Sequence, residues 1–178
     1  VVLATQNPIE QEGTYPLPEA QTDRFMLKVK VDYPTMDEEK LIVEGHLKGS
    51  LHAATEAVCN KDDIAGAREA IGKIYVDGRI AQYVVDIVFC TRNAGQYGLK
   101  EMERYIQYGG SPRASINLAL AARTTAFMKR RGYVIPEDVR DMAADVLRHR
   151  IGLTYEAEAD NVTTDDIISD ILNAVKVP

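Results

Sequence analysis

The sequence after Tyr33-Pro34 is dominated by one recurring pattern, in which apolar residues at helical spacing follow a capping residue and precede a glycine. Ser111-Pro112 shows the start of this pattern, because serine is a good N-cap and proline suits the first helical position. Gly132 ends the same stretch, as glycine commonly does after a helix. We expect helices at about residues 35–47, 62–76, 79–93, 111–131, 136–150 and 165–175.

The first 33 residues have a different character. Residues 1–4 are apolar at successive positions, as in a parallel strand that is covered on both faces. Residues 25–31 alternate apolar and polar side chains, which predicts a second strand at a sheet edge. A short helix is expected between them at residues 19–22. The fold class predicted is therefore mainly α, with residues 1–33 a two-strand remnant of an α/β core and residues 34–178 a helical domain.

The composition is that of a soluble globular protein and excludes several kinds of function. A net charge of −6 argues against a broad nucleic-acid-binding surface, which needs many lysines and arginines to neutralise phosphates. No stretch approaches the roughly 20 apolar residues of a membrane span.

The two cysteines, Cys59 and Cys90, are far apart and predict buried free thiols of a cytoplasmic protein. The apolar start at Val1, without methionine or a signal peptide, predicts that the natural protein continues upstream.

Arg113 is the first candidate functional residue, because it stands in the first turn of the helix that Ser111-Pro112 opens. A cation at this position opposes the helix dipole, which favours anions at the N-terminal end. In one interpretation it is a solvated arginine on a capped helix. In the other, its guanidinium joins free backbone N–H groups and the flexible Gly109-Gly110 pair in binding a phosphate.

Arg24 and Asn7 are candidates at the ends of polar segments. Arg24 can pair with Asp23 or a nearby glutamate, or it can be supplied to the nucleotide of another subunit, where it would stabilise a transferring phosphoryl group. Asn7 follows the first predicted strand, where it can satisfy a turn or orient a water molecule beside a phosphate. The residues alone leave both choices open.

Two segments resemble MoxR ATPases of the AAA+ superfamily. The segment LATQNPIEQEGTYPLPEAQTDRF, Leu3 to Phe25, is similar to the corresponding stretch of that family. The segment GGSPRASINLALAARTTAFMKRRGYVIPEDVRDMAADVLRHRIGLTYEAEAD, Gly109 to Asp160, resembles the family's helical lid domain. With the helices between them the resemblance covers essentially the whole chain, although residues 47–107 match less distinctively.

The resemblance implies a role for each candidate. Asn7 matches the sensor 1 position, Arg24 the arginine finger that acts on a neighbouring subunit, and Arg113 the sensor 2 position of the lid. It also implies ATP and Mg²⁺ as ligands of the intact protein, a homo-oligomeric, hexameric ring and a chaperone-like function. The implied clients are proteins with von Willebrand factor A domains or metalloenzymes under assembly.

One departure from the family is large. No G-x-x-x-x-G-K-[ST] sequence occurs, and no apolar strand ends in the paired acids that hold Mg²⁺. We therefore expect these 178 residues to be the C-terminal portion of such an ATPase and, alone, to bind no ATP tightly and hydrolyse none. The alternative from another class is a non-catalytic helical protein-interaction module with purely structural arginines.

Overall fold

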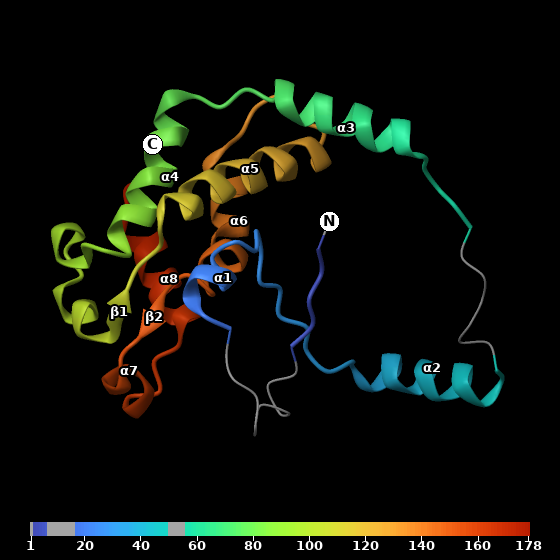
Figure 1. Ribbon diagram of the computed structural model, residues 1–178, viewed down its shortest axis with the longest axis horizontal. Coiled ribbons are helices and arrows are strands. Elements are labelled where there is room, and N and C mark those ends of the chain that lie inside the picture. Colours follow the sequence, from blue (N-terminus) through green and yellow to red (C-terminus); the bar gives the residue numbers. More distant parts are fainter. Residues whose placement is uncertain (1, 7–16, 50–55) are drawn as a thin grey trace.

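The structure is a computed structural model that describes residues 2–6, 17–49 and 56–178 (Figure 1). Helices dominate it, as the sequence predicts. In chain order the elements are α1 (Glu19–Thr22), α2 (Met36–Leu47), α3 (Lys61–Lys73), α4 (Gly78–Cys90), the 3₁₀ helices η2 (Ala94–Tyr97) and η3 (Lys100–Tyr105), β1 (Ile106–Tyr108), α5 (Pro112–Met128), α6 (Pro136–Leu147), β2 (Gly152–Leu153), α7 (Tyr155–Ala159) and α8 (Thr164–Ala174).

Local capping explains where several helices begin. The Thr35 side chain accepts from the Glu38 N–H while Glu38 bonds back to the Thr35 N–H, which is a complete capping box. At α5 the Ser111 hydroxyl accepts from the Arg113 N–H, and Pro112 occupies the first helical position. Because these interactions span only a few residues, the sequence predicts them well.

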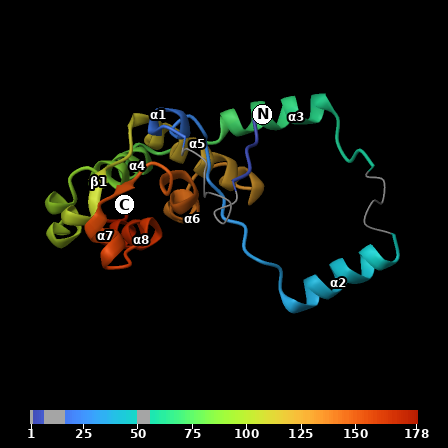
Figure 2. The same cartoon turned by 60° about the horizontal axis from the view of Figure 1, so that its bottom comes forward.

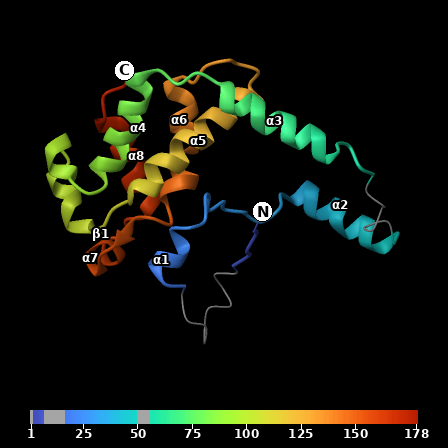
Figure 3. The same ribbon diagram turned by 45° about the horizontal axis from the view of Figure 1, so that its top comes forward.

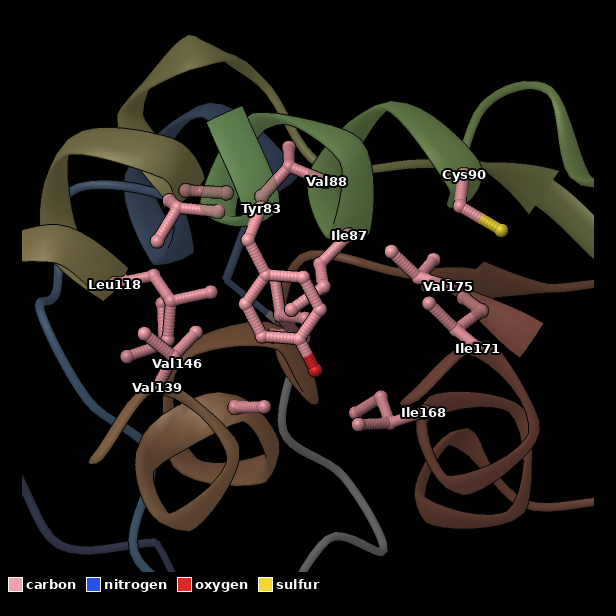
Figure 4. Packing of buried hydrophobic residues seen from close by; sticks show 14 of the residues in the cluster. Tyr83, Ile87, Val88, Cys90, Leu118, Val139, Val146, Ile168, Ile171 and Val175 are labelled. Carbon is pink, nitrogen blue, oxygen red and sulfur yellow. The ribbon is translucent and has the colours of Figure 1, made fainter. Parts of the chain in front are cut away.

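The core lies between α4, α5, α6 and α8 (Figure 4). Tyr83 and Ile87 of α4 point into the space between the helices, where Leu118, Val146 and Ile168 meet them from α5, α6 and α8. Each of these side chains is almost fully removed from water, and burying one large apolar side chain contributes roughly 1.5–3 kcal/mol. This packing makes the four helices one rigid support for the segments attached to them.

Helices α2 and α3 extend away from this bundle (Figures 1 and 2). Neither contains a buried residue, but the last turn of α3 is tied to α5, where the Arg123 guanidinium donates to the Gly72 carbonyl. Helix α2 exposes Met36, Leu41 and Leu47. Within the described residues, no helix combines the length and the apolar character needed to cross a membrane.

The two predicted strands are not strands in the structure. Residues 2–6 and 25–31 have no strand pairing, and the two-stranded antiparallel sheet pairs β1 with β2 instead. The physical reason is that a strand needs a partner strand, and the described residues offer none to either segment. Residues 25–31 lie against the end of α6, where the Lys28 N–H donates to the Asp145 carbonyl at 2.8 Å and Leu27 packs against the core.

The two cysteines differ in exposure, so the prediction of two buried thiols is wrong for one of them. Cys59 is exposed, whereas Cys90 is fully buried in α4, and burial raises its pKa to about 11. Because the thiolate is the reactive form, Cys90 should not react at neutral pH while the protein is folded.

We expect a thiol reagent such as Ellman's reagent to titrate one thiol in the native protein and two in denaturant. Two rapidly reacting native thiols would contradict this packing.

Candidate functional site

Asp23, in the turn that ends α1, joins parts of the chain that are far apart in sequence. Its carboxylate accepts hydrogen bonds from the Ser111 hydroxyl at 3.0 Å, from the terminal nitrogen of Arg113 at 3.0 Å and from Nε of Arg150 at 3.0 Å. The turn after α1 therefore contacts both the start of α5 and the end of α6 (Figures 1 and 3). One carboxylate thus holds two guanidinium groups and a helix cap.

The charges around Asp23 favour its ionised form. Burial alone would raise the pKa of Asp23, but hydrogen bonds from Arg113, Ser111 and Arg150 outweigh burial, so the pKa lies below its ordinary value. The carboxylate is therefore negative at neutral pH and compensates part of the positive charge of the two arginines.

Arg113, a candidate from the sequence, lies at this cluster. Its side chain is 56% exposed while it pairs with Asp23, so one side of the guanidinium is in contact with solvent. Arg113 is thus largely solvated at a capped helix start, as in the simplest interpretation, and it has one charged partner. A partly exposed guanidinium retains donors for a phosphate, and Asp23 limits its freedom to move.

Arg24 follows Asp23 directly but takes no part in its ion pairs. Its side chain is exposed, and among the described residues no hydrogen bond or ion pair holds it. The expected alternative of pairing with Asp23 is therefore wrong, because Asp23 is bound by Arg113 and Arg150 instead. An exposed guanidinium beside a rigidly held residue is available to a partner molecule.

The backbone at the start of α5 is less open than the sequence suggests. The Gly110 N–H donates to the hydroxyl of buried Thr91 at 2.9 Å, and the Arg113 N–H bonds to Ser111. A Cβ at Gly109 would come within 2.4 Å of the Thr91 carbonyl, so this glycine permits close packing. The expectation of free N–H groups and flexible glycines that bind phosphate is wrong for these positions, and the side chain of Arg113 remains the candidate donor.

Arg150 also belongs to the cluster, although no motif in the sequence marked it as a candidate. It lies after α6, is 3% exposed, and donates to the Asp23 carboxylate and to backbone carbonyls near it. The sequence signal was weak, because nothing local distinguishes Arg150 from the nearby Arg148.

Asn7, the third candidate, lies outside the described residues. Among the described residues, no group of three or more histidines, cysteines, aspartates and glutamates can hold a metal ion.

Comparison with known proteins identifies the relatives of this chain. Residues 100–171 match the model of the AAA lid domain, and residues 1–27 match that of the ATPase family associated with various cellular activities (AAA). The chaperone MoxR1 of Mycobacterium tuberculosis is 41% identical over 100% of this chain and 47% of its own length. The chain belongs to the MoxR family of AAA+ ATPases.

Two further relatives extend the comparison. The uncharacterized protein YeaC of Bacillus subtilis is 39% identical over 99% of this chain and 52% of its own. A crystal structure of an ATPase candidate from Cytophaga hutchinsonii superposes with a TM-score of 0.91 at 42% identity, over 97% of this chain and 52% of that one. This MoxR-type chain thus spans about half the length of the relatives it matches.

Proposed function

We propose that this chain forms part of an ATPase in which Arg24 and Arg113 stabilise the negative charge that develops on the γ-phosphate of ATP as water attacks it. Membership of the MoxR family supports this function. The chemistry suits the residues, because catalysis of phosphoryl transfer consists mainly of positioning and electrostatic stabilisation. Asn7 would orient the attacking water from the sensor 1 position.

The observation that carries the proposal is that the Asp23 carboxylate binds Arg113 while Arg24 follows Asp23 directly in the chain. Arg113 binds the Asp23 carboxylate with half of its side chain exposed, and Arg24, the next residue along the chain, is exposed without a partner among the described residues. Two cations near the same turn of the chain can stabilise phosphoryl charge at nucleotide sites between subunits.

The wider assembly follows from the same proposal. Residues 1–33 would complete the α/β nucleotide-binding core and residues 34–178 would form the lid, in a homo-oligomeric ring of six subunits with ATP between neighbours. Arg24 would reach the nucleotide of the adjacent subunit. Mg²⁺ would screen the phosphates, with ligands outside the described residues. We propose a cytoplasmic protein that remodels or matures partners, among them von Willebrand factor A domain proteins or metalloenzymes, and does not bind nucleic acid.

Steady-state hydrolysis of ATP by the full-length protein tests the proposal. We expect Arg113→Ala to lower kcat/KM by about a hundredfold, since removing one donor to a transition-state oxyanion typically costs 10²–10³. The matched control is Arg79→Ala, which removes an exposed arginine paired with Asp77 far from the cluster and should leave the rate unchanged.

Two outcomes would count against this function. The first is absence of ATP hydrolysis in the full-length wild-type protein, which would favour a helical interaction module. The second is equal loss of activity in the Arg113→Ala and Arg79→Ala variants, since it would show that the measured loss is unrelated to the Asp23 cluster. Residues 1–178 alone should show background hydrolysis, because they contain no phosphate-binding loop sequence.

A further inference from the structure

Arg150 is a buried cation whose hydrogen-bonding capacity is fully used. Its side chain is 1% exposed, and Nε donates to the Asp23 carboxylate at 3.0 Å. One terminal nitrogen donates to the carbonyls of Asp23, at 3.0 Å, and Phe25; the other donates to the carbonyls of Met26, at 3.3 Å, and Val146. A guanidinium has five N–H donors, so every one has an acceptor.

Four of these five bonds reach the short segment 23–26, which contains Arg24. They bind residues on both sides of Arg24, and none of them involves its side chain. The adjacent His149 adds a contact of 3.0 Å between Nε2 and the Phe25 carbonyl. Residues 25 and 26 belong to no helix or strand; the Phe25 N–H donates to the Thr22 carbonyl at 3.0 Å, and side chains after α6 bind the carbonyls of Phe25 and Met26.

The same Asp23 carboxylate binds Arg113 at the start of α5. Arg150 therefore connects the two exposed cations through one intermediate residue. We propose that Arg150 is a positioning residue, which holds segment 23–26 and the start of α5 in a fixed relation so that Arg24 and Arg113 are both in place at the nucleotide sites between subunits. This inference rests on the proposed function. It assigns a role to a buried residue that would contact neither ATP nor the attacking water.

The geometry requires arginine at this position. A lysine could pair with the Asp23 carboxylate, but its single ammonium group cannot reach carbonyls spread along three residues as the planar fork of arginine does. An apolar residue of similar length, such as methionine, would keep the volume and lose all five bonds. Arg150→Lys should therefore remove some of the bonds to segment 23–26, and Arg150→Met should remove all of them.

Limited trypsin digestion of the full-length protein reports directly on the segment, because trypsin cleaves after arginine. In the wild type we expect slow cleavage of the Arg24–Phe25 bond. In Arg150→Met we expect cleavage there to be about tenfold faster relative to the Lys48–Gly49 bond after α2, with Arg150→Lys in between, since cleavage follows local opening. Mass spectrometry of the fragments gives both rates.

Arg140→Met is the matched control for a general loss of stability. Arg140 lies in α6, the helix that precedes Arg150, and donates to the Leu172 carbonyl and to the Tyr83 hydroxyl, away from segment 23–26. Equal acceleration at Arg24 in Arg140→Met, or none in Arg150→Met, would overturn the proposal. If circular dichroism shows that Arg150→Met is unfolded, the cleavage rate at Arg24 is compared between Arg150→Lys and Arg140→Met instead. Equal rates in these two variants would then overturn the proposal.

Kinetics of the full-length protein separate positioning from a merely structural role. We expect Arg150→Met to lower kcat about tenfold while KM for ATP changes less than twofold, because Arg24 acts on the transition state and not on ATP binding. Unchanged kcat in a variant with faster cleavage at Arg24 would refute the role. If the wild type hydrolyses no ATP, the proposed function fails, while the trypsin comparison still decides whether Arg150 holds the segment.

Discussion

Replacing Arg24 with alanine in the full-length protein is expected to lower kcat for ATP hydrolysis by about a thousandfold, the lower end of what an arginine finger contributes. The reason is electrostatic. Arg24 is exposed and has no partner among the described residues, so its guanidinium is available to the charge that develops on the transferred phosphoryl group. A thousandfold change corresponds to about 4 kcal/mol of transition-state stabilisation.

A coupled phosphate-release assay measures this loss, with Lys28→Ala as the matched control. Lys28 is an exposed cation in the same segment, whose described contacts are made by its backbone N–H and carbonyl. Its replacement should leave kcat within a factor of two, as is usual for surface charges. Wild-type turnover by Arg24→Ala alone would exclude the role proposed for Arg24.

A mixing experiment examines whether Arg24 acts on a neighbouring subunit. Arg24→Ala subunits would be combined with subunits that carry a substitution of the phosphate-binding-loop lysine in the full-length protein. A ring that contains both variants has interfaces with an intact nucleotide site facing an intact Arg24. We expect activity to recover on mixing, whereas two inactive variants that remain inactive together would indicate action within one subunit.

The largest loss of stability is expected for Asp138→Ala. Asp138 lies in the first turn of α6, is 0% exposed, and accepts from a terminal nitrogen of Arg131 at 2.7 Å and from the Ile135 N–H at 3.0 Å. The substitution removes the partner of Arg131, which is 22% exposed, and the acceptor of the Ile135 N–H, and losing hydrogen bonds to a charged group costs about 3 kcal/mol. Urea denaturation measures the change in the free energy of unfolding.

Asp141→Ala is the control for this substitution, because Asp141 is on the same helix and pairs with Lys129 while 52% exposed. An exposed pair contributes little, so the change should stay below about 1 kcal/mol. Similar losses for Asp138→Ala and Asp141→Ala would show that burial does not set the strength of the Asp138 contacts.

Asp138 should also contribute to the acid sensitivity of the fold. Burial raises the pKa of Asp138, but the hydrogen bonds from Arg131 and the Ile135 N–H outweigh it, so the pKa lies below its ordinary value. A lowered pKa in the folded state stabilises the protein above the pKa of the unfolded chain, about 3.9, and this stabilisation disappears as the pH falls through the folded value. Between about pH 5 and pH 2, the wild type should lose stability more steeply than Asp138→Ala. Parallel pH profiles would contradict this account.

Local sequence determined the helices of this protein. The helices predicted near residues 35–47, 111–131 and 136–150 are confirmed as α2, α5 and α6, with ends that differ by a few residues. Thr35 with Glu38, and Ser111 with Pro112, act within one turn of chain, so the information needed to start each helix is contained in neighbouring residues. The same is true of the apolar spacing that buries one face of α4.

Tertiary structure decided the state of residues 25–31 and the composition of the candidate site. The alternating pattern at 25–31 predicts a strand, but strand pairing depends on a partner far away in sequence, and in the described structure side chains after α6 bind this segment instead. The sequence allows Asp23 to pair with Arg24, whereas in the structure Asp23 binds Arg113 and Arg150. The sequence indicated Arg24 and Arg113 as separate candidates. Only the packing between α5, α6 and the turn after α1 brings Arg113 and Arg150 to the carboxylate of Asp23, beside Arg24, because a hydrogen bond between residues about a hundred positions apart leaves no local signature in the chain.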